Sequence, residues 1–477
     1  MNLKNIPLSI LKPRLGFCVV ATILLLCGLV MAFSASTITS ISAGNESTSY
    51  LLSQGTFAAI GMVVAVFIFL LPLRFWKDFW NGKITWVIWG VCFALIIATA
   101  VFGVSHGGAK RWIVLPGIGE IQPGEFIKIG LALVACRIIE DYDNGEISLK
   151  SLVIGLFLFL VLPLGLIYIT QSDLGTTIII AVCLISALYY TDKPMKALLV
   201  IVSVCAILGL VAVFGSGYRS ERMVYLDPWN DGEDGFGSGY QTIHSLYALA
   251  DGGLFGVGLG NSCEKFLYLP ANNTDYVFAV VCEELGVVGG MAIVLLFLAL
   301  LYFGLKISRL CQSSFSRGLS GCLATMLVFQ AFLNMGCAIS LFPMTGKPLP
   351  FFSVGGSSML ATMMVLGFVL ACSRASEEET PEAEFTRRRE NLRVTTHAPQ
   401  SQAQEQAGHT PRRSQQWPQQ QRSQRVYEAP SRTQRLGTER TQWSGASRSQ
   451  RQAPYQTQRH SGSQSESSSF SRTRERR

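Results

Sequence analysis

Residues able to do chemistry stand at the ends of apolar runs in this sequence. Glu125 and Lys128 lie near the start of the run 122–139, which is long enough to enter a membrane. They are three residues apart, so on a helix they share one face and can pair. Charged side chains at membrane depth usually face a protein interior or an aqueous cavity. The pair is therefore predicted either to close the outer end of a helix or to line a polar cavity.

Two neighbouring cations and the start of one apolar run are suited to anion recognition, and an Asp precedes another apolar run. Lys110 and Arg111 follow a glycine pair, and an Arg in that setting suits bidentate binding of phosphate. The same two residues are equally suited to anchoring the chain at a membrane interface. Asp173 directly precedes an apolar run and is predicted to cap it, which is compatible with a functional role. Ser357 begins another run, where the free N–H groups of a helix start can bind an anion.

The longest polar interval between apolar runs covers 216–275 and ends at Asp275. It is rich in aromatic residues and glycine, unlike a disordered segment. A long loop without helix or strand periodicity is usually functional, so we expect an ordered loop here. Asp275, with Thr274 before it, either caps the run that follows or takes part in chemistry.

The elements that must position these residues are membrane spans. Hydrophobic residues make up 49% of the chain and charged residues 15%, whereas soluble proteins carry about 25% charged residues. Runs of about 20 apolar residues cross a bilayer, and about ten occur: 15–37, 51–73, 84–104, 122–139, 151–170, 174–190, 196–214, 276–305, 319–341 and 357–373. We therefore predict an all-α polytopic membrane protein of about ten transmembrane helices, with its large outer loop between spans seven and eight.

Basic residues near the span ends set the predicted orientation. One side of the membrane receives Lys4, Lys12, Arg14, Arg74, Lys77, Lys83, Lys193, Lys196, Lys306, Arg309, Arg317 and Arg374. The first run has no convincing cleavage site and is predicted to be an anchor. Both termini are then cytoplasmic, and 216–275 faces outward. Basic residues in the outer loops are unexpected under this rule and suggest that the loops bind an anionic ligand. These residues are Lys110, Arg111, Arg219, Arg222, Lys265 and Lys347.

The last part of the chain, 374–477, differs in kind from the rest. It holds 19 Arg and 11 acidic residues, which accounts for the whole net charge of +8, so 1–373 are neutral. Rich in Gln, Arg, Ser, Thr and Pro, it cannot bury a core. We predict a ten-span domain at 1–373 and a disordered cytoplasmic tail at 374–477. The tail acts as a solvated spacer, is attracted to anionic lipids, or docks cytosolic partners; nucleic acid is not expected.

The sequence suggests no metal site. The chain has 12 Cys residues, nearly all within apolar runs, without a CxxC or His-spaced cluster. Buried Cys usually behaves as a small hydrophobic residue. Cys263 lies in the large outer loop and has no obvious partner. His106 and His244, also in outer loops, are expected at the surface.

The polar segments together resemble the SEDS family (shape, elongation, division and sporulation). The motifs appear in family order over about 110–360: Lys110-Arg111-Trp112-Ile113, Gln122-Pro123-x-Glu125, Gln171-x-Asp173-Leu174-Gly175-Thr176, Asp227-Pro228-Trp229, Gly237-Ser238-Gly239-Tyr240-Gln241, Gly256-x-Gly258-Leu259-Gly260-Asn261-Ser262, Lys265, Tyr268-Leu269-Pro270, Thr274-Asp275, Glu283-Glu284-Leu285-Gly286 and Pro343 to Ser358. Each motif alone is weak, but the ordered set is highly specific. The part from Gly256 to Pro270 is more similar to cell-division members than to elongation members.

The resemblance implies a ten-span glycosyltransferase that polymerises lipid II into peptidoglycan strands. Division members work with a class B penicillin-binding transpeptidase at the septum. The implied partners are therefore lipid II, that transpeptidase, other division proteins and the lipids of the plasma membrane, with an outward-facing active site. The family's key acid maps onto Asp275. Ala271 and Asn273 stand where a Glu and a His are common, which puts an accessory acid–base or metal role there in doubt.

The implied reaction is an inverting transfer that releases undecaprenyl diphosphate. Asp275 would take the proton of the acceptor hydroxyl as general base, and fixed cations would stabilise the departing pyrophosphate. Arg111 and Lys128 are the first candidates within a wider substrate-binding set: Lys110, Arg111, Glu125, Lys128, Asp173, Arg219, Arg222, Lys265, Lys347 and Ser357. No cofactor is evident, although Mg²⁺ or Mn²⁺ could help to neutralise the pyrophosphate. A lipid II flippase and a non-catalytic division scaffold are the alternatives; polar motifs crowded on the outer side favour chemistry there.

Overall fold

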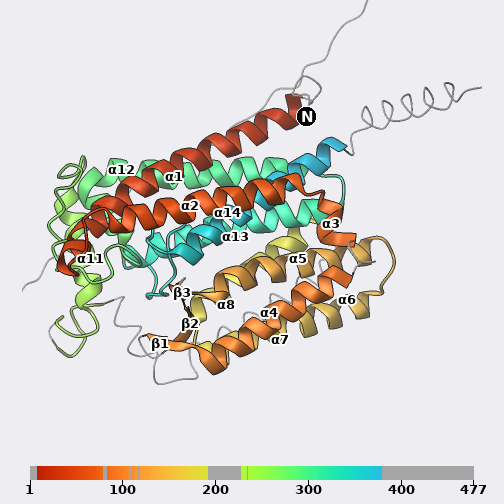
Figure 1. The fold of residues 1–477 in the computed structure, drawn as a ribbon, viewed down its shortest axis with the longest axis horizontal. Coiled ribbons are helices and arrows are strands. Elements are labelled where there is room, and N and C mark those ends of the chain that lie inside the picture. The colour runs from red at the N-terminus through yellow and green to blue at the C-terminus, as the bar shows by residue number, and fades with distance from the viewer. Residues whose placement is uncertain are drawn as a thin grey trace, which may run out of the picture. The chain divides into compact units, whose positions relative to one another are not determined.

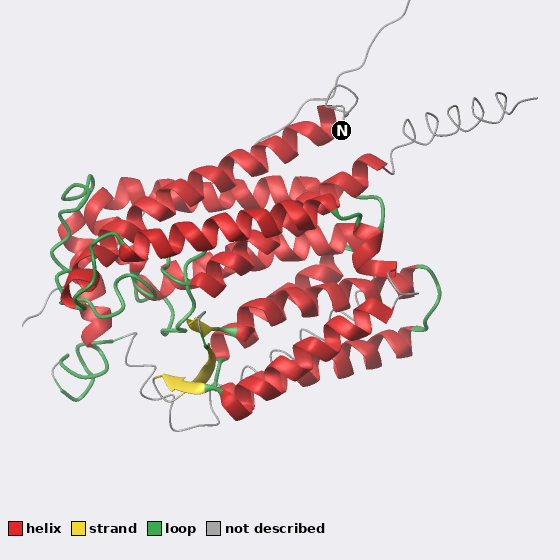
Figure 2. Cartoon of the chain, in the orientation of Figure 1, coloured by secondary structure: helices red, strands yellow, loops and turns green. Residues whose placement is uncertain are grey.

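The chain forms a bundle of long helices (Figures 1 and 2). The computed structural model describes residues 8–78, 83–106, 109–116, 119–191, 227–233 and 235–378. The helices are α1 (Leu8–Ser42), α2 (Ser49–Leu70), α3 (Leu73–Asp78), α4 (Lys83–Phe102), α5 (Pro123–Asp143), α6 (Leu149–Leu156), α7 (Leu162–Gln171), α8 (Leu174–Tyr190), α11 (Tyr240–Gly252), α12 (Val277–Leu310), α13 (Ser314–Ala338) and α14 (Gly356–Glu378). A π-helical turn, η2 (Phe157–Val161), joins α6 to α7.

The prediction of a polytopic, mostly helical membrane protein is confirmed. In the described part of the chain, 7 helices are long and apolar enough to cross a membrane: Ile10–Ser42, Ser49–Leu70, Lys83–Phe102, Leu149–Gln171, Val277–Leu310, Ser314–Ala338 and Gly356–Arg374. Helix α8 is also apolar but has 17 residues. Helix α5 covers the predicted span 122–139 and carries charged side chains inside the bundle. The predicted span 196–214 lies outside the described residues, as does the tail beyond Glu378, where α14 ends.

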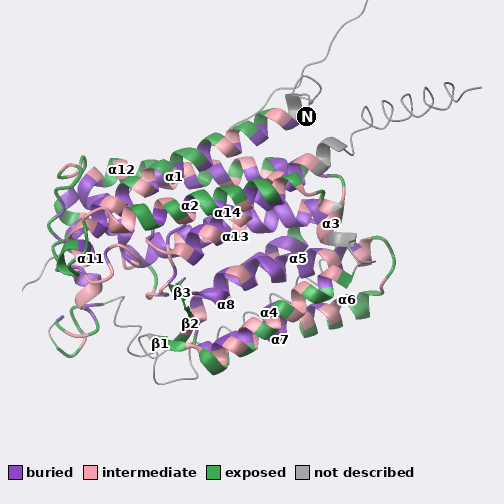
Figure 3. Cartoon of the chain, viewed as in Figure 1, coloured by how far each residue is buried: buried purple, intermediate pink, exposed green. Residues whose placement is uncertain are grey.

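Helices α13 and α14 form the centre of the bundle (Figure 3). In their most apolar stretches 83% and 78% of the residues are buried, against 28% in α2 and 22% in α4. Helix α13 packs against α5, α8 and α12, and α14 packs against α2. The outer helices expose large apolar side chains such as Val63, Val101 and Leu298. These faces suit lipid tails, which are as apolar as leucine.

A small antiparallel sheet, which the sequence pattern did not predict, follows α4. Its strands lie side by side in chain order: β1 (Val104–His106), β2 (Ala109–Leu115) and β3 (Gly119–Ile121). Strand β3 leads directly into α5, whose first residue is Pro123, a position where proline is favoured. Strand β2 packs against α5. The sheet therefore joins α4 to α5 and carries Arg111 on β2.

Part of the long outer loop is helical, so the prediction of a loop without regular structure was wrong there. Helix α11 packs against α12. Before α11, the carboxylate of Asp231 accepts backbone N–H groups at 2.9–3.0 Å from Gly235, Glu233, Gly239 and Gly237. These hydrogen bonds lower the pKa of Asp231 to about 2. Asp231 thus organises the approach to α11, a role that sequence reasoning missed.

Helix α12 is broken at Gly286, where φ is 70° and ψ is −175°. A Cβ atom at this position would lie 2.4 Å from the backbone nitrogen of Gly256 and 2.4 Å from the carbonyl oxygen of Leu254. Only glycine permits that approach. The backbone N–H of Val257 also donates to the carbonyl of Glu283 at 3.0 Å. The contacts of Gly286 and Glu283 with residues 254–257 fix the outer loop against the first turns of α12.

Candidate active site

Asp275 lies two residues before α12 begins, at the end of the long outer loop. Its backbone N–H donates to the carbonyl of Ala271 at 3.1 Å, and that carbonyl also accepts the N–H groups of Thr274 and Tyr276. Ala271 adopts a left-handed backbone with φ 55° to make this turn. Tyr276 is the cap residue of α12, and no side chain caps the helix. The alternative that Asp275 serves as a helix cap is therefore wrong.

The carboxylate of Asp275 has the setting expected of a proton acceptor. It accepts no hydrogen bond from the residues that the structure describes, and the side chain is half-buried. Burial raises the pKa of Asp275, and the charges of Lys347 and Arg111 partly offset this rise. A carboxylate with a raised pKa is a stronger base near neutral pH than an ordinary surface Asp.

Asp173 and Lys347 form a buried ion pair beside this acid. Asp173 caps α8, as predicted, by accepting the backbone N–H of Thr176 at 3.0 Å. The Lys347 ammonium lies 2.6 Å from Asp173 Oδ2 and donates to Thr176 Oγ1 at 2.5 Å. Burial alone would raise the pKa of Asp173, but Lys347, Arg111 and the hydrogen bonds together lower it to about 2. Asp173 therefore stays ionised and holds Lys347 in place.

Arg111 is the cation next to the proposed base. Its Nη2 donates to the carbonyl of Ser172 at 3.0 Å, and its Nε lies 3.9 Å from Asp173 Oδ2. A methyl group on Gly346, where φ is 63°, would lie 3.2 Å from Arg111 Nη1 and 3.9 Å from Asp275 Oδ2. Gly346 therefore separates the guanidinium from the carboxylate. Because Gly346 has no side chain, the space between Arg111 Nη1 and Asp275 Oδ2 is wider than any other residue would leave it.

The predicted Glu125–Lys128 pair is present and buried. Lys128 Nζ lies 2.9 Å from Glu125 Oε2 and donates to Gln330 Oε1 on α13 at 2.5 Å. Gln330 in turn donates to the carbonyl of Pro348 at 3.0 Å. The other oxygen of Glu125 is buried without a hydrogen-bond partner in the described part of the chain. Through Gln330, the pair thus joins α5 to the loop that carries Lys347.

Three polar residues that sequence reasoning missed hold the proline-rich loop 342–355 in place. Gln54 on α2 donates to the carbonyl of Ser353 and accepts the N–H of Gly355. Ser353 Oγ donates to the carbonyl of Thr274 at 2.5 Å. Asn334 on α13 binds the same region from the other side. For Gln54 and Asn334 the available signal was a polar residue inside an otherwise apolar span.

The remaining predicted residues do not gather around Asp275 in the same way. Lys265 forms a separate buried cluster, 2.9 Å from Glu284 Oε1 and 3.2 Å from Ser34 Oγ. Ser357 accepts the backbone N–H of Gln122 at 3.3 Å, which joins the starts of α5 and α14. Lys110 is exposed on β2, and its neighbour in the strand faces the opposite side. The predicted residues Arg219 and Arg222 lie outside the described part.

Two further expectations concern the outer-loop cysteine and histidine. Cys263 is exposed and unpaired. His244 is not simply at the surface, because its Nδ1 lies 2.7 Å from Glu264 Oε2 and its ring packs 4.2 Å from that of Tyr240. Within the described ranges no group of three or more His, Cys, Asp and Glu side chains has a metal-binding arrangement.

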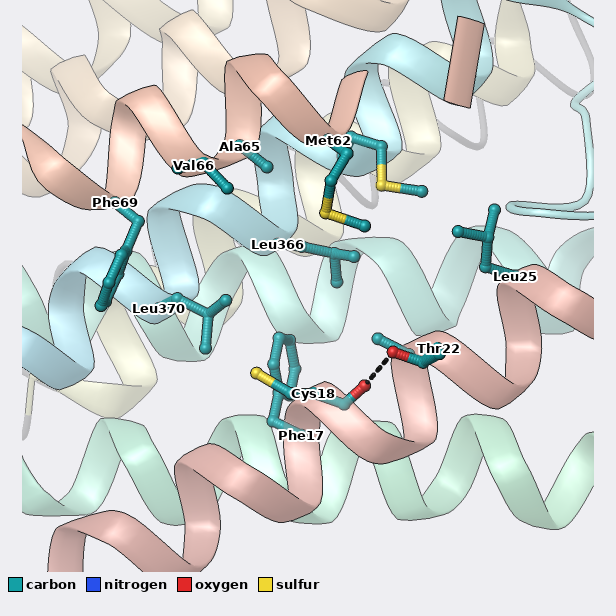
Figure 4. Close-up of a pocket in the computed structure, with 12 residues that line it drawn as sticks. Phe17, Cys18, Thr22, Leu25, Met62, Ala65, Val66, Phe69, Leu366 and Leu370 are labelled. Atoms are coloured by element: carbon teal, nitrogen blue, oxygen red, sulfur yellow. Dashed lines mark hydrogen bonds between the residues drawn. The ribbon is translucent and has the colours of Figure 1, made fainter. Parts of the chain in front are cut away.

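An apolar cavity of about 160 Å³ lies between α1, α2 and α14 (Figure 4). It is lined by Phe17, Cys18, Ala21, Thr22, Leu25, Met62, Ala65, Val66, Phe69, Met363, Leu366 and Leu370. Its hydroxyl group, that of Thr22, already donates to the carbonyl of Cys18. The lining offers no carboxylate, imidazole or cation for acid–base chemistry. The site around Asp275 therefore remains the candidate active site.

Comparison with known proteins identifies the family of this chain. The FtsW/RodA/SpoVE family, described as cell cycle protein, matches residues 14–378. The chain belongs to this family. The match covers α1 to α14 and every described residue of the candidate site.

Members of the FtsW/RodA/SpoVE family from several bacteria align with most of this chain. Stage V sporulation protein E of Bacillus subtilis is 34% identical over 374 residues, which cover 76% of this chain and 98% of that protein. A probable peptidoglycan glycosyltransferase FtsW of Nitrosomonas europaea is 32% identical over 373 residues, 76% of this chain and 93% of its own.

Solved structures of the family share the fold. One described as coordinating polymerization and crosslinking in a peptidoglycan synthase complex has a TM-score of 0.54 and 26% identity, covering 73% of this chain and 96% of its own. A mutant of the rod shape determining protein RodA of Thermus thermophilus has a TM-score of 0.53 at 24% identity, over 74% and 96% of the two chains.

Proposed function

We propose that this chain polymerises lipid II into peptidoglycan strands by glycosyl transfer, with inversion and release of undecaprenyl diphosphate. Relatives that align along most of its length are named peptidoglycan glycosyltransferases. The observation that carries the proposal is the half-buried carboxylate of Asp275, which is free of hydrogen bonds in the described part and faces Arg111 across Gly346. A base next to a cation is the arrangement that transfer from a pyrophosphate-linked sugar requires.

The proposed mechanism divides the work between these residues. Asp275 accepts the proton of the acceptor hydroxyl as that oxygen attacks the anomeric carbon of the donor, a contribution typically worth about 10²–10⁴-fold. The pyrophosphate leaves from the opposite face, and Arg111 stabilises its charge. Arg111 suits this role because its Nη1 lies beside Gly346, on the side that faces Asp275 Oδ2. Lys347, paired with Asp173, adds positive potential without direct contact.

The remaining predicted substrate ligands have supporting roles in this proposal. Lys128 and Glu125 hold the loop that carries Lys347 through Gln330, and Lys110 is exposed on the face of β2 opposite to Arg111. Mg²⁺ or Mn²⁺, where the reaction uses one, would be bound chiefly by the pyrophosphate oxygens. Lys265 is proposed to order the outer loop through Glu284.

A test of the function uses purified full-length protein and labelled lipid II, with and without a class B transpeptidase, the proposed partner at the division septum. A polymerase gives glycan ladders that a transpeptidase inhibitor leaves intact. A lipid II flippase would move the labelled lipid across liposomes without lengthening it. A scaffold would give ladders only when a separate polymerase is present. Ladders from this chain with its partner support the proposal, and their absence from every lipid II preparation contradicts it.

The proposed orientation, with both termini cytoplasmic and the active site outside, predicts a labelling pattern. Cys263 is the exposed cysteine among the described residues, and it lies in the large outer loop. An impermeant thiol reagent added to intact cells is expected to label the protein at Cys263. Cys263→Ser should abolish the label. Labelling that appears only after the cells are opened would reverse the orientation.

A further inference from the structure

Helix α13 presents two amide side chains to the candidate active site. Gln330 and Asn334 are four residues apart, so they lie on one face of the helix. Both are buried, with 3% and 2% of their surface exposed. A buried amide in an apolar span is costly unless it is hydrogen-bonded. Both amides do form hydrogen bonds, and both bind the loop that carries Lys347.

Asn334 differs from Gln330 because it binds two separate segments with one nitrogen. Its Nδ2 donates to the backbone carbonyl of Asp275 at 2.8 Å and to that of Lys347 at 2.8 Å. These residues lie 72 positions apart in the sequence, on two different loops. In the described part of the chain, Asn334 is the one side chain that bonds to the backbones of both. Among the residues that the structure describes, its Oδ1 is buried without a hydrogen-bond partner.

We propose that Asn334 is a positioning residue that sets the distance between the Asp275 carboxylate and the Lys347 ammonium. The inference rests on the proposed function, since it assigns Asp275 as the base. Asn334 touches neither reacting atom in this arrangement. It acts by fixing the two backbones from which the side chains extend.

The rest of the loop has other supports, so the role of Asn334 is specific. Gln54 and Ser353 fix the far half of the proline-rich loop, and Gln330 fixes Pro348. Ser353 Oγ also donates to the carbonyl of Thr274 and accepts the N–H of Leu349, so the loop stays attached to the Asp275 turn without Asn334. No other side chain in the described region, however, bonds to the backbones of Asp275 and Lys347 themselves. A displacement of about 1 Å at a catalytic group can lower the rate about 10²-fold.

The test replaces Asn334 by Leu, which has a similar size and cannot form hydrogen bonds. We expect kcat for lipid II polymerisation to fall about 10–100-fold while KM changes little, because the defect lies in alignment and not in substrate binding. We also expect the acid limb of the pH–rate profile to move to higher pH. Lys347 and Arg111 are the charges that lower the pKa of Asp275, and a loosened Lys347 lowers it less.

Ser320→Ala is the matched control. Ser320 is also buried on α13, and its Oγ donates to the carbonyl of Gly304 on α12 at 3.3 Å, so it bonds across helices without being part of the Asp275 turn. The control is expected to lower thermal stability to a similar degree and to leave the acid limb where it is. If Asn334→Leu fails to fold, Asn334→Ser, which keeps one donor, should show the same direction with a smaller effect.

The outcomes separate this inference from the proposed function. A wild-type protein that makes glycan and an Asp275→Asn variant that does not would support the function, whatever Asn334 does. The positioning role is overturned if Asn334→Leu loses activity by the same factor at all pH values. It is also overturned if the acid limb of the pH–rate profile shifts equally in the control, because either result shows a general structural role. A variant with unchanged kcat would overturn it as well.

Discussion

The Asp275→Asn variant is expected to lose lipid II polymerisation by about 10²–10⁴-fold, the usual contribution of a general base. The amide has the size of the carboxylate but cannot accept a proton. The backbone bonds to Ala271 and Asn334 do not involve the side chain, so the fold should persist. Glycan synthesis from labelled lipid II measures the loss, and thermal unfolding in detergent confirms that the variant is folded.

Asp251→Asn provides the matched control, since Asp251 is exposed on α11 in the same outer region. It makes the same chemical change away from the site and should retain activity. The wild-type acid limb should also lie above the usual Asp value of about 3.9. Burial raises the pKa of Asp275, and a base works only when ionised, so activity falls as the pH drops through that raised value. An Asp275→Asn protein that still makes long glycan would show that another group is the base.

Lys347→Met is expected to lower the free energy of unfolding by about 3–5 kcal/mol, the usual cost of removing one partner from a buried ion pair. Both side chains of the Lys347–Asp173 pair are almost completely buried. The variant leaves the Asp173 carboxylate without its nearest cation, and Arg111 at 3.9 Å compensates only weakly. The shift in the unfolding transition in detergent measures the effect.

Adding Asp173→Asn to Lys347→Met should recover part of that loss. The double variant buries no unpaired charge, and Asn is as good an N-cap as Asp. Lys306→Met is the matched control, because Lys306 is exposed and bonds only to the Tyr302 hydroxyl in the described structure; its effect should stay within about 0.5 kcal/mol. Strictly additive effects of the two site substitutions would mean that the pair does not interact energetically.

Local contacts in this site were predictable from the sequence, whereas distant ones were not. The Asp173 cap and the Glu125–Lys128 pair span three residues each, and helix geometry alone dictates them. The Lys347–Asp173 pair joins residues 174 positions apart. No spacing rule indicates which acidic side chain pairs with a lysine on a loop. Lys347 was therefore predicted to bind the anionic substrate, whereas its ammonium pairs with the carboxylate of Asp173. Lys265 was assigned to the substrate for the same reason, and its ammonium pairs with Glu284.

The missed elements also have physical causes. Strand β2 has 7 residues without a polar–apolar alternation, and its partners are three-residue strands, too short to show one. Helix α11 has 13 residues and mixes aromatic, small and polar side chains, so it is too short and too polar to be recognised as a membrane span. The long apolar helices, by contrast, need only length and hydrophobicity to be recognised. These properties are visible in sequence, and seven of the predicted spans were confirmed as helices that can cross a membrane.

The buried charges of α5 carry a consequence for biosynthesis. Lys128 finds its amide partner on α13, 202 residues later in the chain, so α5 must enter the membrane long before Gln330 has been made. A lone charge at the centre of a bilayer costs about 2.5–3.5 kcal/mol on insertion scales. Glu125, one turn away, supplies the opposite charge from within the same helix. The Glu125–Lys128 pair can therefore enter the membrane as an electrically neutral unit, and the glutamate compensates the lysine charge until α13 packs against α5.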